Sequence, residues 1–209
     1  MKIVVIGANG KAGSLIVDEA LYRGHDVTAI VRDASKVVQD VKKIEKDIFD
    51  IEENDLTQFD VVINAFGAGK SDPIIYQTST KHLINILGES LTRLIVVGGA
   101  GSLYTDETLS IQVYQTPDFP PFVYPTSSNM AKALELLQNS LVNWTFFAPA
   151  INFDYKGRRV GRYTMGSNYV ILNSMNESYI SYKDYVVALL DEVQKKKFIK
   201  KTCTAISEK

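Results

Sequence analysis

The chain has 209 residues, of which 45% are hydrophobic and 22% charged, so it can bury a core and is not expected to be disordered. Its formal net charge of -1 provides no overall field to attract nucleic acid or an anionic membrane. The single cysteine, Cys203, excludes an intramolecular disulfide and suits a reducing compartment. The six residues before Gly7 are too few for the apolar region of a signal peptide, and no apolar run approaches a membrane span. We therefore expect a cytoplasmic protein without a membrane or nucleic-acid partner.

The first residues predict a strand, a helix and a second strand. Residues 3–6 are a β-branched run without polar alternation, which is typical of a parallel strand buried on both faces. Residues 12–23 place apolar side chains near one helical face, and Gly24 ends this helix. Residues 26–31 form the next predicted strand.

The same alternation continues to residue 148. We expect further strands at 42–46, 59–66, 93–97 and 144–148, and helices at 35–38, 76–87 and 128–141. Residues 116–125 contain four prolines and predict an ordered loop. Strands alternating with helices indicate an α/β protein with a Rossmann-type, doubly wound parallel sheet.

The last quarter of the chain breaks this rhythm. Residues 152–181 are rich in Gly, Tyr, Arg and Asn and contain no long apolar run. We expect them to form a small lobe on the substrate side of a single domain that spans residues 1–209. A helix at 182–195 and a strand at 202–206 complete the prediction, and Cys203 is interpreted as a small apolar side chain of that strand.

A glycine-rich turn joins the first predicted strand to the first helix. Gly7, Gly10 and Gly13 follow one another at intervals of three, and glycine lets the backbone approach a ligand closely. The following helix directs its positive end at the turn, which favours a diphosphate. The alternative is a tight turn without a ligand. We predict that the turn binds NAD(P) through Gly7, Asn9, Gly10, Lys11, Ala12 and Gly13.

The residue after the second strand is expected to determine whether the protein prefers NADP(H) or NAD(H). Arginine there pairs with the 2′-phosphate of NADP, whereas an acid would bond the ribose hydroxyls of NAD. Arg32 stands at this position and Asp33 follows it. We therefore favour NADP(H) over NAD(H), with Lys11 as a helper. The alternative is a solvated arginine beside an acid that serves NAD.

Other strand ends are expected to line the same crevice, because ligands bind at the carboxyl edge of an open parallel sheet. We assign residues 47–48 to the adenine, 65–67 to the ribose, 98–100 to the space beneath the nicotinamide, and 149–152 to its far side. The alternative for each is an ordinary strand-to-loop junction. The cofactor-binding residues assigned in this way are Asp47, Ile48, Ala65, Phe66, Gly67, Gly98, Gly99, Ala100, Pro149, Ala150 and Ile151.

With these residues the chain resembles an atypical short-chain dehydrogenase/reductase, and within that class the bacterial group that carries the NADH-flavin reductase label. This group lies near the NmrA-like proteins and biliverdin reductase B. The resemblance covers nearly the whole chain and implies NADPH-linked reduction of flavins or quinone-like acceptors. The motifs that carry it are residues 7–13, 31–32, 46–50, 93–103, 116–120, 143–145, 148–150, 157–163 and 180–185.

The catalytic pair typical of short-chain dehydrogenases is missing. That pair is a tyrosine with a lysine four residues later, which lowers the pKa of the phenol. Tyr124 is the nearest candidate, but Ser128 follows at that spacing and Lys132 stands eight residues on. Tyr179 and Lys183 have the spacing, but they follow the sixth strand and are interpreted as coincidence.

No other catalytic residue can be assigned from the sequence. The positions that hold a serine and a histidine in biliverdin reductase B are, by the resemblance, Ala100 and Ile151. His25 and His82 lie far apart without a ligand motif, so no metal site is expected.

Hydride transfer to a flavin or quinone needs little acid catalysis, because the acceptor delocalises the charge. The protein has to stack the acceptor on the nicotinamide and exclude water. We assign substrate binding to Phe153, Tyr155 and Tyr163, and Phe66 also suits stacking, with packing inside the lobe as the alternative. Three arginines, at 158, 159 and 162, are candidates to hold an anionic acceptor such as a flavin phosphate, although a solvated loop is the favoured interpretation.

The sequence therefore predicts an NAD(P)H-dependent oxidoreductase that uses a small-molecule acceptor, with a flavin as a possible substrate. The alternative is a non-catalytic sensor that binds NADP(H) and reports redox state to a partner, as NmrA-like proteins do. The absent tyrosine–lysine pair favours the sensor, and the small lobe favours the enzyme. Either protein is expected to be a monomer or a homodimer.

Overall fold

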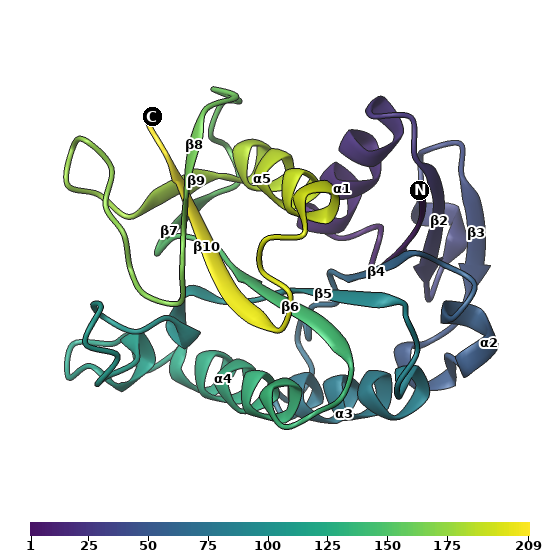
Figure 1. Ribbon diagram of the computed structural model, residues 1–209, viewed down its shortest axis with the longest axis horizontal. Helices are drawn as coiled ribbons and strands as arrows, with labels where there is room; N and C mark the ends of the chain where they lie inside the picture. Colours follow the sequence, from purple (N-terminus) through teal and green to yellow (C-terminus); the bar gives the residue numbers. More distant parts are fainter.

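An eight-stranded sheet forms the centre of the protein, as seen in a computed structural model that describes residues 1–209 (Figure 1). The strand order is β3-β2-β1-β4-β5-β6-β10-β8, and all neighbours are parallel except β10 and β8. This arrangement confirms the predicted Rossmann-type α/β fold. The strands are β1 (Lys2–Ile6), β2 (Asp26–Val31), β3 (Lys42–Glu45), β4 (Val61–Asn64), β5 (Arg93–Val97), β6 (Asn143–Ala148), β8 (Tyr163–Gly166) and β10 (Lys201–Ser207).

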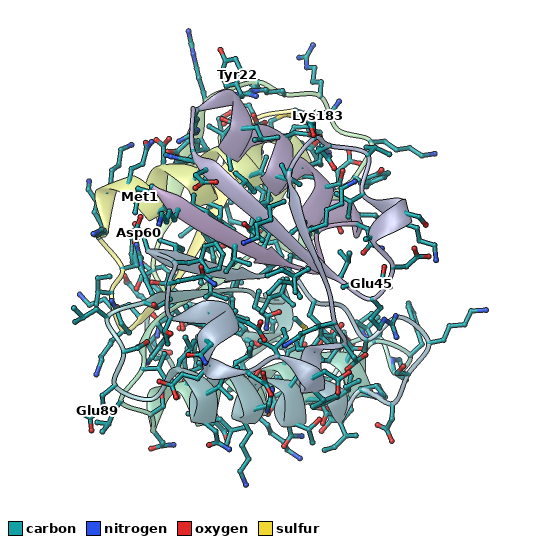
Figure 2. All side chains as sticks on the ribbon, turned by 90° about the vertical axis from the view of Figure 1, so that its right-hand side faces the viewer. Met1, Tyr22, Glu45, Asp60, Glu89 and Lys183 are labelled. Carbon is teal, nitrogen blue, oxygen red and sulfur yellow. The ribbon has the colours of Figure 1, made fainter.

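Helices cover both faces of this sheet. Helices α1 (Lys11–Tyr22) and α5 (Tyr182–Lys195) lie side by side on one face. On the other face lie α2 (Glu53–Leu56), α3 (Ile75–Leu87) and α4 (Tyr124–Gln138), and Figure 2 shows the two helical layers with the sheet between them. Four short 3-10 turns complete the chain: η1 (Ala34–Lys36), η2 (Ile48–Asp50), η3 (Ala100–Ser102) and η4 (Val113–Gln115).

Each face of the sheet has its own hydrophobic core, because the central strands are buried on both sides. Ile16 of α1 and Leu189 of α5 belong to one core, and Leu83 of α3 and Leu134 of α4 belong to the other. Continuous burial along β1, β4 and β5 explains why these strands show no polar alternation.

Most predicted elements occur within a few residues of their expected positions, and three differ. Helix α4 begins at Tyr124 rather than residue 128, because Pro125 fits the first turn of a helix, where no amide hydrogen is required. The predicted strand 59–66 is shorter, at Val61–Asn64. The short helix expected at 35–38 is the 3-10 turn η1.

The expected lobe at 152–181 is partly absorbed into the main sheet. Strands β7 (Asn152–Asp154) and β9 (Tyr179–Ser181) form a small parallel sheet of their own, whereas β8 pairs antiparallel with β10. The segment therefore adds one strand, β8, to the central sheet and forms a separate two-stranded sheet from β7 and β9. No helix in the chain combines the length and hydropathy needed to cross a membrane.

Candidate functional site

A cleft of about 880 Å³ runs along the carboxyl ends of the central strands. Its walls come from the segments that follow β1, β2, β3, β4, β5 and β6, and from the first turn of α4. This volume lies in the range of small-molecule and cofactor sites, and the position is the usual ligand site of open α/β sheets.

The glycine turn forms one side of the cleft and is closely packed. Gly7 has a φ of +75°, and a Cβ there would lie 2.8 Å from the carbonyl oxygen of Ala65. A Cβ on Gly13 would lie only 2.1 Å from the carbonyl oxygen of Gly7. Only glycine therefore fits these two positions, and the turn is held against the chain that leaves β4.

The first turn of α1 is open to an anion. No side chain caps the helix at Gly10, and the first turn contains no acidic residue. The first amides of a helix have no partner inside it, and here Lys11 and Ala12 face the cleft together with Asn9. A diphosphate fits this cradle in charge and in hydrogen-bonding capacity. Gly13 is buried behind the turn and does not line the cleft.

Arg32 lines the cleft beyond β2, and its exposed side chain forms no ion pair in the protein. The neighbouring Asp33 is engaged elsewhere. Its carboxylate accepts hydrogen bonds from the amide and hydroxyl of Ser35 and pairs with Lys36 at 3.0 Å. Hydrogen bonds from Ser35 and Lys36 lower the pKa of Asp33. Of the two neighbours, only the arginine is available to a ligand in the cleft.

The end of β3 contributes a cation that the sequence analysis missed. Lys46 lines the cleft, and its ammonium pairs with Asp55 at 2.6 Å and with Glu52 at 3.7 Å. Asp47 does not line the cleft, because its carboxylate accepts the amide hydrogen of Phe49 and caps η2. Ile48 does line the cleft. Of the two residues assigned to the adenine, only Ile48 is therefore in position to contact it.

The segment after β4 lies in the middle of the cleft. Asn64 accepts a hydrogen bond from the amide of Phe66, and this turn presents Ala65, Phe66 and Gly67 to the cleft. Tyr76 of α3 packs edge-on against Phe66, with ring centroids 6.3 Å apart.

The segments after β5 and β6 close the opposite end. Ala100, Pro149, Ala150 and Ile151 all line the cleft, as do Gly98 and Gly99. A Cβ on Gly98 would meet the Phe146 ring at 2.2 Å. The residues assigned to the nicotinamide therefore lie together, and close packing against β6 fixes them.

The first two turns of α4 present no tyrosine–lysine pair to the cleft. The residues of α4 that line the cleft are Thr126, Ser127 and Met130. Thr126 and Met130 are four residues apart and therefore share one helical face. Tyr124 is 49% exposed and packs against Tyr114 outside the cleft.

The other tyrosine–lysine spacing in the chain lies away from the cleft. The hydroxyl of Tyr179 donates to Asp154 at 3.1 Å, and neither Tyr179 nor Lys183 lines the cleft. This placement agrees with the interpretation of that spacing as coincidence.

Three aromatic rings form a cluster next to Lys11, the first residue of α1. Phe153 stacks on Tyr182 with ring centroids 3.7 Å apart and planes 8° from parallel, and both rings line the cleft. Tyr155 packs edge-on against Tyr182 just outside the lining, with Lys11 5.0 Å from its ring centre. Burial raises the pKa of Tyr182. No signal in the sequence singles out Tyr182, because it is the first residue of an ordinary amphipathic helix.

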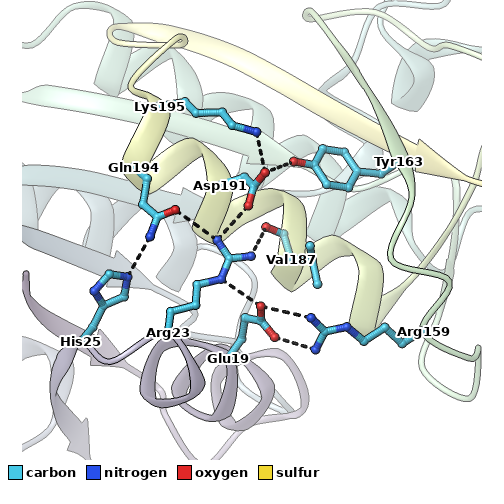
Figure 3. A network of polar contacts seen from close by, with 9 residues as sticks. All are labelled: Glu19, Arg23, His25, Arg159, Tyr163, Val187, Asp191, Gln194 and Lys195. Carbon is cyan, nitrogen blue, oxygen red and sulfur yellow. Dashed lines mark hydrogen bonds and ion pairs between the residues drawn. The ribbon is translucent and has the colours of Figure 1, made fainter.

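Tyr163 lies outside the cleft, contrary to its assignment to the acceptor. Its hydroxyl donates to Asp191 of α5 at 2.5 Å, in the polar network of Figure 3. In the same network Arg159 pairs with Glu19 of α1 at 2.7 Å. Arg158 donates to the carbonyl oxygen of Lys209. Each of these side chains has its partner outside the cleft, and none of them lines it.

The loop between β5 and α4 supplies an apolar wall that the sequence analysis described only as an ordered loop. The signal was present in its prolines and aromatic side chains, but nothing local indicated which way they face. The wall consists of Val113, Phe119, Pro120 and Val123.

The histidines and the cysteine lie away from the cleft. The ring of His82 is bonded to the carbonyl oxygen of Ile51, and His25 contacts Gln194 in the network of Figure 3. Cys203 is fully buried in β10, where burial raises the pKa of its thiol.

Comparison with known proteins places the whole chain among nicotinamide-binding proteins. The NAD(P)H-binding family matches residues 7–192. The uncharacterized protein YwnB of Bacillus subtilis (strain 168) is 47% identical over 211 residues, which cover 100% of this chain and 99% of that protein. A crystal structure from Streptococcus pneumoniae TIGR4, described as a "putative NADH-flavin reductase", is 42% identical with a TM-score of 0.95 and full coverage of both chains. A crystal structure of a Lactobacillus casei protein is 28% identical with a TM-score of 0.89, again over both whole chains.

The family match spans the glycine turn, the cleft and most of α5. The predicted resemblance is confirmed by these relatives, and the cradle at the start of α1 is suited to the diphosphate that they imply. The chain belongs to the NAD(P)H-binding family.

Proposed function

We propose that the protein is an NAD(P)H-dependent oxidoreductase that uses NADPH to reduce a flavin or quinone-like small molecule. The observation that carries the proposal is one cleft that joins an uncapped helix start, without acidic residues in its first turn, to an apolar chamber walled by aromatic and aliphatic side chains. The relative described as a flavin reductase, 42% identical over its whole length, supports this choice of acceptor.

Different stretches of the cleft would bind different parts of the cofactor. The turn from Gly7 to Ala12 would hold the diphosphate, and Arg32 would pair with a 2′-phosphate. The strand ends at 98–100 and 149–151 would hold the nicotinamide in place, and the apolar wall would exclude water from it. When bound, NADPH supplies a hydride, and a delocalised acceptor takes that hydride together with one proton from water.

The direct test follows NADPH absorbance while riboflavin, FMN and several quinones are added in turn. We expect NADPH oxidation with at least one of these acceptors. Calorimetry run alongside reports NADPH binding. Binding without turnover of any acceptor would refute the oxidoreductase and leave the fold assignment intact.

A second function rests on the face of α4. Thr126 and Met130 occupy positions facing the cleft at the spacing of the catalytic pair of short-chain dehydrogenases, and neither can act as that pair does. A protein that binds NADP(H) and reports its redox state to a partner needs no such pair. A pull-down whose yield depends on whether NADPH or NADP⁺ is present, without turnover of any acceptor, would support this sensor.

Arg32 provides a test of cofactor choice. Replacing Arg32 with Ala removes the unpaired guanidinium at the end of β2, so we expect the dissociation constant for NADPH to rise roughly tenfold or more. NADH lacks the 2′-phosphate, so its dissociation constant should change little. Arg162→Ala removes another exposed arginine outside the cleft and serves as the control. Equal weakening of both cofactors by Arg32→Ala, or equal wild-type affinity for them, would contradict the 2′-phosphate contact.

A further inference from the structure

The charged side chains of the cleft all lie toward one end. Lys11, Arg32 and Lys46 follow β1, β2 and β3, which are neighbours on one side of the sheet. The segments that follow β5 and β6 contribute only uncharged residues to the lining. The segments that follow β5 and β6 therefore place no charged side chain in the wall at the nicotinamide end, and the cation that approaches this end is Lys11 of α1, whose ammonium lies 5.0 Å from the ring centre of Tyr155.

The chain that builds this end is also depleted of positive charge. No lysine or arginine occurs between Arg93 and Lys132, and the three charged residues in that span are Asp106, Glu107 and Asp118. An anionic acceptor would meet no cation from this span, and the acidic side chains disfavour its approach.

The arginines that follow β7 do not supply the missing charge. Arg159 is paired with Glu19, and Arg158 is bonded to the last residue of the chain. Arg162 does not line the cleft either. A phosphate on the acceptor therefore has no partner in the lining of this end.

One nearly buried serine that lines the cleft has a free hydroxyl at the uncharged end. Ser127 is 6% exposed and lines the cleft, and its hydroxyl forms no hydrogen bond within the protein. It packs on the segment after β5, since a Cβ on Gly101 would lie 2.7 Å from its Oγ. Because Ser127 lines the cleft and its hydroxyl has no partner in the protein, that hydroxyl is free to donate a hydrogen bond to a ligand. The hydroxyl of Ser128 next to it is bonded to the carbonyl oxygen of Pro125.

Resting on the proposed function, we propose that the acceptor is an uncharged, planar molecule with ring carbonyl groups, and that the hydroxyl of Ser127 donates a hydrogen bond to one carbonyl oxygen. Neutral quinones and a flavin without a phosphate have this chemistry. The reduction consumes NADPH and one proton from water and yields NADP⁺ and the two-electron-reduced acceptor. Phe119, Val123 and Ile151 supply the apolar contacts to the rings.

Riboflavin and FMN test the charge of the acceptor because they differ only by one phosphate. Quenching of flavin fluorescence would measure the binding of each to the protein saturated with NADP⁺, and initial rates with NADPH would give kcat/KM. We expect riboflavin to bind and react at least as well as FMN. Preference for FMN by about threefold or more would overturn the proposal, as would failure of both flavins and of a neutral naphthoquinone to bind. Binding of riboflavin in preference to FMN, without turnover of either flavin or of any quinone, would refute the oxidoreductase but not this selectivity.

Ser127 and Ser128 form a matched pair of variants for the hydrogen bond. Ser127→Ala should raise the dissociation constant for riboflavin roughly tenfold, because the carbonyl oxygen loses its donor. The dissociation constant for NADPH and the midpoint of thermal unfolding should stay close to wild type. Ser128→Ala should bind riboflavin as the wild type does, because its hydroxyl is already used within α4. Wild-type riboflavin affinity in Ser127→Ala would overturn the assigned contact.

Discussion

Single atoms decide the shape of the glycine turn. The Cα of Gly13 lies so close to the carbonyl group of Gly7 that no Cβ fits between them, whereas a Cβ on Gly10 would lie 3.2 Å from the same oxygen. Gly13 cannot accept a methyl group unless α1 moves. At Gly10 a methyl group would need the neighbouring carbonyl oxygen of Gly7 to move by only a few tenths of an ångström.

This difference predicts an order of severity for two alanine variants. Gly13→Ala should lower the free energy of unfolding by about 1–3 kcal/mol and raise the dissociation constant for NADPH more than roughly tenfold, since the start of α1 has to shift. Gly10→Ala should have smaller effects on both quantities. Chemical denaturation and calorimetry measure them. NADPH binding to Gly13→Ala at wild-type strength would contradict the diphosphate cradle.

At the scale of elements, a polar network connects α1, α5 and β8 behind the cleft (Figure 3). Asp191 of α5 accepts hydrogen bonds from Tyr163 at 2.5 Å, from Arg23 at 2.8 Å and from Lys195 at 2.5 Å. Burial alone would raise the pKa of Asp191, but the hydrogen bonds from Lys195, Tyr163 and Arg23 outweigh it and lower the pKa to about 2. The network therefore depends on the ionised carboxylate.

The lowered pKa of Asp191 predicts an acid-dependent loss of stability. In the unfolded chain this carboxyl has its ordinary pKa of 3.8, so the stabilisation is complete above that pH and is lost as the pH falls toward 2. The free energy of unfolding should decrease by about 2 kcal/mol over that window from this group. Asp191→Asn should flatten this part of the pH profile, and Asp26→Asn, at an exposed aspartate, should leave it unchanged. An unchanged acid profile in Asp191→Asn would contradict the assigned pKa.

Across the whole molecule, one buried ion pair connects the central sheet to a helical layer at the end opposite the cleft. Arg93 begins β5, is 2% exposed and pairs with Glu192 of α5. It also donates to the hydroxyl of Thr145 at 2.7 Å. Glu192 accepts hydrogen bonds from the amides of Lys197 and Phe198, so the pair also holds the turn that leads into β10.

Breaking the Arg93–Glu192 ion pair should lower the free energy of unfolding without changing the affinity for NADPH. Arg93→Met leaves Glu192 buried without its cation, so the free energy of unfolding should fall by about 3–5 kcal/mol. The double variant Arg93→Met/Glu192→Met removes both charges and should recover part of that loss. Its dissociation constant for NADPH, measured on folded protein, should match the wild type. Additive losses in the double variant would show that the two charges do not interact.

The sequence alone determined those features whose cause is local. An unbroken β-branched run predicts a strand buried on both faces, and a glycine repeat between strand and helix predicts the anion cradle, because each depends on residues only a few positions apart. The α/β alternation and the position of Arg32 after β2 follow in the same way. The predicted helix at 182–195 coincides with α5, whose start is capped by Ser181 and whose last turn carries Lys195.

Tertiary structure alone decided the features that depend on pairing between distant segments. Tyr163 faces Asp191 because β8 pairs with β10, and a strand of four residues carries no signal of its partner. The miss at Asp47 has a local cause instead, because its carboxylate caps η2 through the amide of Phe49. The free hydroxyl of Ser127 and the apolar wall become visible only when α4 packs against the end of β5. Residues close together in the sequence determine where strands and helices form. Which side chains point into the cleft depends on how distant segments pack together, and the periodicity of the sequence carries no information about that packing.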